Sequence, residues 1–392
     1  MNRRNLLIIS DLFPNPDNSY FGSIFVKNQV EYLKEHFDNV YVISPVAYGV
    51  ERFRKTTHHD YQYDNVKVFF PRYLNILFFY KFCRWVWVFL EARAIISLIE
   101  KEKLDFGLIH AHFTWPSGVV ATDLKKRYHV PVVITEGSSR TFQRAIDQRN
   151  RYYINSYEMC DAIIRNNKKD LPLLRNLGLS ENKIHYVEYG YDEKIFFPIP
   201  KYEAREELGI SHSIKLILTI GRLSEEKGHI DLIDALAVVV KENPDVICII
   251  GGTGSLKQEL ERRIADMQLT DVIKLIGFVP NKQMPLWISA ADFFVLPSLS
   301  EGNPTVMLEC LGCGTPFVGT KVGGIPDVIT TDDYGLLVEP SNPIDLADKM
   351  SLALTKEWNR EKILEYAEQY SSRIAVQKIL AIYKNIKPLT NK

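Results

Sequence analysis

LILTIGRLSEEKG, residues 216–228, joins an apolar run to a glycine, two cations and the start of a helical pattern. A short, continuously apolar run of this kind is typical of a strand covered on both faces. Gly221 lets the backbone approach a ligand closely. Arg222 can bind two phosphate oxygens, Lys227 adds a point charge, and the helix that follows adds its positive N-terminus. The stretch therefore predicts a strand–turn–helix unit suited to a diphosphate. A surface loop whose cations pair with the neighbouring glutamates is the alternative.

The same alternation of strand and helix runs through the chain and pauses only at 188–203, a segment that contains Tyr, Gly and Pro. It predicts parallel sheets with right-handed crossovers. We expect two doubly wound, Rossmann-like α/β domains, 1–195 and 196–371, and a C-terminal helix near 372–392 that packs back on the first. Open α/β sheets bind ligands outside the carboxyl ends of their strands, so a ligand cleft is expected between the domains. The predicted strands are 6–10, 40–44, 66–70, 106–110, 132–135, 162–165, 184–188, 216–220, 246–250, 272–275, 293–297, 317–319 and 336–338.

The composition is that of an ordinary globular chain, with 392 residues, 46% hydrophobic and 24% charged. The net charge is +0, yet residues 1–190 hold 26 Lys and Arg against 20 Asp and Glu. This surplus suits an anionic partner such as a membrane surface or a phosphorylated lipid, and uneven solvated faces are the alternative. Nucleic acid is not expected, because the basic residues are scattered and no reader motif occurs.

Five cysteines in a chain of this length form no disulfide framework, and their number suits a reducing cytoplasm. Cys310 and Cys313 are interpreted as small buried residues on a helix, because one CxxC pair cannot supply the ligands of a zinc site. No apolar run is long enough for a secretory signal or a membrane-spanning helix. We therefore expect a cytoplasmic chain, with peripheral contact to the inner face of the membrane as an open addition.

Two further loops of the second half carry ligand-binding chemistry. Gly252, Thr253 and Gly254 follow one predicted strand and open a helix, as a phosphate loop does, although a plain turn fits as well. Beyond the strand 293–297, Glu301 lies where a ligand is expected and Glu309 follows two helical turns later. Carboxylates accept hydrogen bonds from vicinal hydroxyls, so one could hold a hexose and the other a ribose. The helix start at Asn303, Pro304 and Thr305 offers free amides to a phosphate or sugar oxygen.

These loops together resemble the paired signature of the family-4 retaining glycosyltransferases of the GT-B fold, in which the second element is an E-x7-E motif. The resemblance covers nearly the whole chain and is strongest in 215–345. Further similar phrases are Gly277-Phe278-Val279-Pro280, Ala290-Ala291-Asp292, Cys313-Gly314-Thr315-Pro316, Gly323-Gly324-Ile325-Pro326, Gly190-Tyr191-Asp192, Gly22-Ser23-Ile24-Phe25-Val26 and His110-Ala111-His112.

The resemblance implies a role for the polar residues of the second half. Arg222 and Lys227 would bind the diphosphate, Glu309 the ribose and Glu301 the transferred hexose. The backbone near Phe278 and Val279 would hold the base.

In the first half, the resemblance implies that Gly22 approaches the donor phosphates and that His112 faces the donor sugar. The family needs no divalent metal and no cofactor besides the nucleotide-diphosphate sugar, and no Asp-x-Asp occurs in this sequence. Relatives often carry a histidine where this chain has Thr135-Glu136-Gly137. Glu136 is therefore interpreted as a base, an acceptor anchor or a cap.

An aromatic segment at 73–99 has two interpretations, a helix packed on the first sheet or an interfacial helix on a membrane. If it is helical, Lys81, Arg84, Val88 and Glu91 share one stripe and the rest is apolar.

The resulting hypothesis is a metal-independent, retaining hexosyltransferase that acts on a glycan or lipid-linked acceptor in cell-surface polysaccharide or glycolipid biosynthesis. The alternatives are a sugar-nucleotide epimerase or hydrolase, or a non-catalytic nucleotide-sugar-binding subunit.

Overall fold

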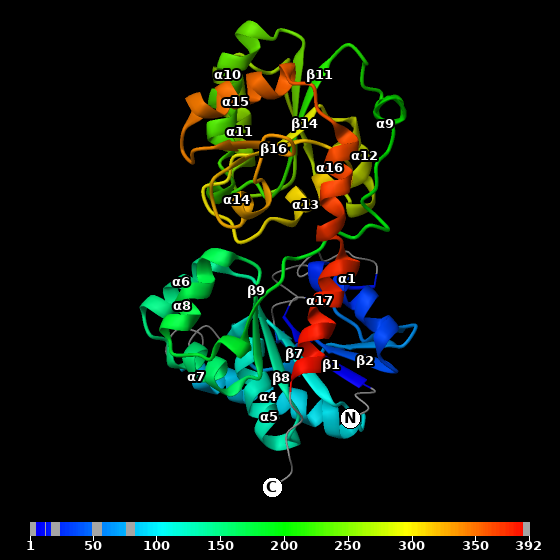
Figure 1. Ribbon diagram of the computed structural model, residues 1–392, viewed down its shortest axis with the longest axis vertical. Helices are drawn as coiled ribbons and strands as arrows, with labels where there is room; N and C mark the ends of the chain where they lie inside the picture. Colours follow the sequence, from blue (N-terminus) through cyan, green and yellow to red (C-terminus); the bar gives the residue numbers. More distant parts are fainter. Residues whose placement is uncertain (1–4, 12, 17–23, 49–56, 76–82, 387–392) are drawn as a thin grey trace. The chain divides into compact units, whose positions relative to one another are not determined.

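The computed structural model describes residues 5–11, 13–16, 24–48, 57–75 and 83–386 (Figure 1). The chain divides into two compact units, Met1–Glu188 with Ala375–Lys392 and Tyr189–Ile374. A sheet between two layers of helices lies at the centre of each unit. The α/β class and the two Rossmann-like sheets expected from the sequence are confirmed. No helix in the described ranges has both the length and the apolarity to cross a membrane.

The first unit is built on an eight-stranded sheet of order β10-β9-β8-β7-β1-β2-β5-β4, in which only the β4–β5 pairing is antiparallel. Helices α4 to α8 pack on the face that carries Leu7 and Ile109, and α1 and α17 pack on the face that carries Leu6 and Leu108 (Figure 1). Alternate residues of each strand therefore enter different cores, as expected for a doubly covered sheet.

The strands of this unit are β1 Asn5–Ser10, β2 Asn39–Ile43, β3 Val46–Ala47, β4 Tyr61–Tyr63, β5 Val66–Phe69, β6 Arg72–Tyr73, β7 Leu108–His112, β8 Val132–Glu136, β9 Ala162–Arg165 and β10 Ile184–Tyr186. Its helices are α1 Ile24–Leu33, α4 Arg84–Lys101, α5 Val119–Tyr128, α6 Ser139–Asp147, α7 Arg151–Met159 and α8 Leu171–Asn176. The final helix, α17 Ser372–Asn385, begins in the second unit and runs into the first.

The second unit is built on a fully parallel six-stranded sheet of order β13-β12-β11-β14-β15-β16. Helices α10, α11 and α15 cover one face, and α9, α12, α13, α14 and α16 cover the other (Figure 1). Its strands are β11 Lys215–Ile220, β12 Val246–Gly251, β13 Ile273–Gly277, β14 Phe293–Leu296, β15 Phe317–Thr320 and β16 Gly335–Val338. Its helices are α9 Lys201–Leu208, α10 His229–Glu242, α11 Lys257–Asp266, α12 Met284–Ala290, α13 Thr305–Gly312, α14 Ile325–Val328, α15 Pro343–Thr355 and α16 Arg360–Ala367.

All thirteen predicted strands are present, with one instructive shift. The strand predicted at 106–110 is β7, Leu108–His112, so His112 is its last residue rather than part of a loop. The antiparallel β4 was not predicted, because Tyr61–Tyr63 is short and only half buried.

A buried charge anchors α9 to the second sheet. Arg205 is 3% exposed and donates to the carbonyls of Ile214 and Ala290 and to Asp292 Oδ2, each at 2.9 Å. Asp292 also accepts from the Leu216 amide, at 2.6 Å. One guanidinium thus fixes the helix, the entry to β11 and the turn before β14.

We predict that Arg205→Met lowers the free energy of unfolding by about 3 kcal/mol, because two carbonyls lose their donor and the Asp292 carboxylate loses a buried cation, although Lys201 remains 2.5 Å from its other oxygen. Urea unfolding of the whole chain measures this loss. The matched control is Arg263→Met, whose partner Asp234 is 2.6 Å away at a more exposed site and which should cost about 1 kcal/mol or less. Equal losses in the two variants would contradict the prediction.

Candidate functional site

The carboxyl edge of the second sheet is built by contacts between loop backbones. A Cβ on Gly252, whose φ is +136°, would lie 1.8 Å from the Gly221 carbonyl oxygen. The Gly252 amide donates to the Gly277 carbonyl at 2.6 Å, and the Gly221 amide donates to Gly251 at 3.0 Å. The ends of β11, β12 and β13 therefore form one interlocked backbone floor, which a side chain at 252 would break.

The next residues of these loops lie on top of that floor. The Leu223 amide donates to the Thr253 carbonyl at 2.9 Å, while the side chain of Thr253 and the backbone of Gly254 are exposed. After β13, Phe278 is 53% exposed and Val279 is buried. The edge thus presents backbone groups and one aromatic face to solvent.

Lys227 and Glu301 meet above this edge. The Lys227 Nζ lies 2.6 Å from Glu301 Oε1, and the two side chains are 19% and 9% exposed. Ser298 donates its hydroxyl to the same carboxylate oxygen at 2.7 Å. Ser298 was not predicted from the sequence, although its place three residues before Glu301 in a strand-end loop was a usable signal.

A second backbone contact brings these two residues together. Gly228 has φ +65°, and a Cβ there would lie 2.0 Å from the Pro297 carbonyl oxygen. The Leu299 amide donates to the Glu226 carbonyl at 2.8 Å. The loop after β11 therefore rests directly on the loop after β14, and this contact sets the distance between the cation and the acid.

Arg222 is placed differently from Lys227. Its side chain is 72% exposed, and its guanidinium lies 3.6 Å from Glu226. An exposed pair of this kind contributes little to stability, so the guanidinium can move to another anion at small cost.

Glu309 lies on α13, the helix that follows the Glu301 loop. Asn303 and Pro304 are buried just before this helix, and Thr305 is its first residue. Glu309 is half-buried, and loss of solvation there raises its pKa to about 7, while a hydrogen bond with Thr305 opposes this shift. The helix therefore carries a carboxylate that is costly to ionise within an otherwise apolar segment. Cys310 and Cys313 are buried and free, as predicted.

His112, in the first unit, is 1% exposed at the carboxyl end of β7. Burial lowers the pKa of His112 to about 3, so the ring is neutral near pH 7. Neither ring nitrogen has a hydrogen-bond partner among the described residues. A buried polar group without a partner is costly, which favours a ligand at this ring. Gly22 lies outside the described residues.

Glu136 lies between two loops of the first unit. Its carboxylate is 1% exposed and accepts the Thr114 amide at 3.0 Å and the Ser138 amide at 2.8 Å. Both oxygens are thus occupied in tying the loop after β7 to the loop after β8. These contacts favour the capping interpretation, and the roles as a base or an acceptor anchor stay predictions.

The expected polar stripe on α4 is wrong. Glu91 and Val88 are buried, whereas Trp85 and Phe89 are 63% and 51% exposed. One reason is that Trp87 Nε1 donates to Glu91 Oε2 at 3.0 Å, which gives one oxygen of the buried acid a partner inside the unit. Lys81 lies outside the described residues.

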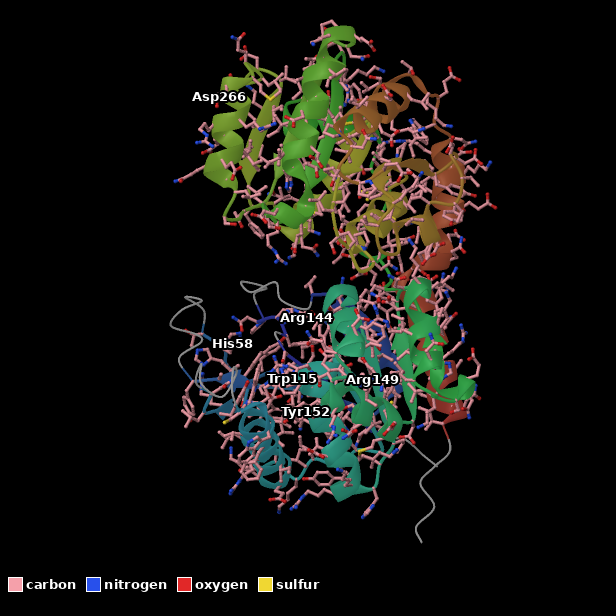
Figure 2. All side chains as sticks on the ribbon, turned by 90° about the vertical axis from the view of Figure 1, so that its left-hand side faces the viewer. His58, Trp115, Arg144, Arg149, Tyr152 and Asp266 are labelled. Carbon is pink, nitrogen blue, oxygen red and sulfur yellow. The ribbon has the colours of Figure 1, made fainter. Side chains whose placement is uncertain are left out.

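Trp87, Trp115 and Tyr152 form a row of packed aromatic rings in the first unit. Trp115 packs edge-on against Trp87, with ring centroids 5.4 Å apart. It also packs edge-on against Tyr152, with ring centroids 5.1 Å apart, and Figure 2 labels these two residues. Between the exposed face of α4 and helices α5 and α7 runs a groove of about 450 Å³, and Tyr152 lies in its wall.

Comparison with known families agrees with this geometry. Residues 22–194 match the model for "Glycosyltransferase Family 4", and residues 200–370 match that for "Glycosyl transferases group 1". The chain belongs to the family-4 glycosyltransferases. The resemblance inferred from the motifs is thereby confirmed, and with it the GT-B fold.

Individual relatives are distant. A D-inositol 3-phosphate glycosyltransferase of Pseudarthrobacter chlorophenolicus is 28% identical over 257 residues, which cover 62% of this chain and 61% of that protein. The match thus spans less than two thirds of that relative. Two solved structures share the fold at 19% identity. The sucrose-phosphate synthase of Thermosynechococcus elongatus has a TM-score of 0.78, with 97% and 98% of the two chains covered. Anabaena HepE, solved in complex with UDP, has a TM-score of 0.74, with 97% and 99% covered.

The raised pKa of Glu309 predicts how the free energy of unfolding of this family-4 glycosyltransferase depends on pH. An acid with a raised pKa in the folded state destabilises the fold once it ionises, and the cost grows between pH 4.5 and pH 7. We predict that Glu309→Gln raises the free energy of unfolding by ~1–3 kcal/mol at pH 8. The gain should shrink toward zero as the pH falls to 4.5. Urea unfolding of both proteins across this range measures it, and a gain independent of pH would contradict the prediction.

Proposed function

We propose that this chain is a hexosyltransferase that moves a sugar, with retention, from a nucleotide-diphosphate sugar to a hydroxyl of a glycan or lipid-linked acceptor. The observation that carries the proposal is the Lys227–Glu301 pair above the glycine-built edge of the second sheet. A diphosphate draws the Lys227 ammonium to itself, and the released Glu301 carboxylate then accepts hydrogen bonds from the sugar hydroxyls. HepE, which shares the fold, was solved with UDP, and this supports a nucleotide diphosphate as the ligand.

The other residues of the edge extend this assignment. The exposed guanidinium of Arg222 donates two hydrogen bonds to the diphosphate, and the exposed ring of Phe278 offers a surface for the base. Ionised Glu309 accepts the ribose hydroxyls. Gly221, Gly252, Thr253, Gly254 and the start of α13 at Asn303, Pro304 and Thr305 line the path of the phosphates and sugar with backbone groups.

In the transfer step the bond from the anomeric carbon to the diphosphate oxygen breaks, and a bond to the acceptor oxygen forms on the same face of the sugar. The acceptor's proton passes to the departing phosphate oxygen, so no protein nucleophile is needed. Lys227 and Arg222 stabilise the negative charge that develops on the diphosphate, which is the work a divalent metal would do in other enzymes. We therefore propose a metal-independent reaction. Neutral His112 exchanges a hydrogen bond with a hydroxyl of the donor sugar.

We predict that Lys227→Ala and Glu301→Ala each lower kcat by at least ~10²-fold, because each removes a group that meets charge or hydroxyls in the transition state. Lys257→Ala is the matched control, because its exposed partner Glu261 is 3.6 Å away on α11, and it should keep wild-type kcat. Sugar transfer from UDP-, GDP- and ADP-sugars measures kcat, and thermal shift with the same nucleotides reports binding, because ligands that bind the folded state raise Tm.

The same assay separates the two alternative functions. Turnover of a sugar nucleotide at full rate without any acceptor would indicate an epimerase or hydrolase. Binding without turnover under all conditions would indicate a non-catalytic subunit. Unchanged kinetics in a correctly folded Glu301→Ala protein would remove Glu301 from the mechanism.

We also propose that the exposed face of α4 contacts a membrane surface, which would bring the enzyme to a lipid-linked acceptor. Trp85 and Phe89 lie one helical turn apart and are largely exposed, and Arg93 follows them along the same wall of the groove. Aromatic rings followed by a cation on one helix face suit the interface of an anionic bilayer.

We predict that the wild-type protein floats with vesicles containing anionic lipid and that Trp85→Ala/Phe89→Ala loses most of this binding. The control is Ile344→Ala, which removes an apolar side chain that is 72% exposed in the second unit. Flotation of the wild type and the control but not of the double variant is the expected result. Failure of the folded wild type to bind anionic vesicles would end the proposal, while sugar transfer to a soluble acceptor would be unaffected.

A further inference from the structure

His112 is held in place by a second histidine two residues earlier on the same strand. Residues i and i+2 of a strand face the same side of a sheet, so His110 and His112 both point toward α17. Their rings stack with centroids 4.5 Å apart and an interplanar angle of 29°. The nitrogens of His112 have no hydrogen-bond partner in the described part of the chain, so this stack is the ring-to-ring contact that sets its orientation.

His110 is fixed from two directions. Its Nε2 lies 2.7 Å from Thr135 Oγ1 on the neighbouring strand β8. Its Nδ1 lies 2.5 Å from the hydroxyl of Tyr383 on α17, 273 residues later in the sequence. A neutral imidazole has one N–H and one lone pair, so His110 donates in one of these bonds and accepts in the other. The two hydrogen bonds therefore fix the angle of its ring and give both ring nitrogens a partner, whichever tautomer is present.

Burial keeps both rings of this pair neutral near pH 7. The pKa of His110 lies well below its usual range, first because the ring is fully buried and then because it faces the His112 imidazole, 4.5 Å away. A neutral His112 offers a sugar hydroxyl one donor and one acceptor, whereas a charged ring would offer donors only.

We infer that Tyr383, Thr135 and His110 are positioning residues for His112, and that the last helix of the chain thereby sets the geometry of the sugar side of the active site. This inference rests on the proposed function. Tyr383 contributes one hydroxyl that acts through His110, and Thr135 contributes another. Displacement of a positioned group by about 1 Å can cost ~10²-fold in rate, so even a small rotation of the stack should be measurable.

The test is a double-variant cycle on the whole chain. Tyr383→Phe removes only the hydroxyl, and kcat should fall about tenfold with little change in the donor KM, because the sugar is still bound but less well oriented. In a His112→Ala background the same change should have no further effect on kcat. Thr135→Val should behave like Tyr383→Phe, and Thr135→Ser should retain wild-type kcat. The control is Tyr366→Phe, whose hydroxyl donates to the Val328 carbonyl at 2.6 Å in the second unit.

A spectroscopic readout separates positioning from a general loss of structure. In protein labelled with ¹⁵N-histidine, Tyr383→Phe should shift the ring signals of both His110 and His112, with Tm close to that of the wild type. Wild-type kcat in Tyr383→Phe, an equal rate loss in the His112→Ala background, or unmoved His112 signals would each overturn the inference. Wild-type protein that transfers no sugar from any donor would instead overturn the proposed function. The ring signals would then still test whether Tyr383 positions His112 through His110.

Discussion

Close contact between the backbones of loops that follow different strands is the constraint on which the second unit depends. At Gly252 and Gly228 the neighbouring carbonyl oxygen occupies the space of a side chain. These contacts leave the loops little freedom to separate, because the strands below them are hydrogen-bonded to one another, β11 to β12 and to β14, and β12 to β13 across a register shift at Ile250 and Gly251. Side chains carried by such loops are therefore placed by the sheet itself, which gives the precision that transition-state stabilisation needs.

The Lys227–Glu301 pair follows from that constraint. A cation on one loop and an acid on the next meet at 2.6 Å because the loops beneath them touch. In the protein without a ligand, each partner of this pair compensates the charge of the other at a partly buried site. The buried His112 of the first unit is held in another way. His112 is buried without a charge to balance, and stacking on a neutral ring holds it.

Much of the fold could be predicted from the sequence, because doubly covered strands are apolar throughout and are separated by helices of ordinary length. The motifs also located Lys227 and Glu301 on their correct loops. The face of α4 could not be predicted, because the hydrogen bond from Trp87 that buries Glu91 is not visible as periodicity. The contact of Tyr383 with His110 could not be predicted either. The two lie 273 residues apart, and only the return of α17 to the first sheet brings them together. Glu136 was ambiguous because a buried cap and a base use the same side chain.

The return of α17 has a consequence for synthesis. The chain leaves the ribosome from its N-terminus, but the first sheet is covered on one face by Val376, Ile379 and Tyr383, which are made after the second unit. Until then Leu6, Ile8 and Leu108 lack part of their apolar cover, and the histidine pair lacks one of its two hydrogen bonds. Domains usually fold in the order in which they are made. Here the first unit is completed only after the second unit has been made, so a product truncated before α17 keeps an exposed apolar face.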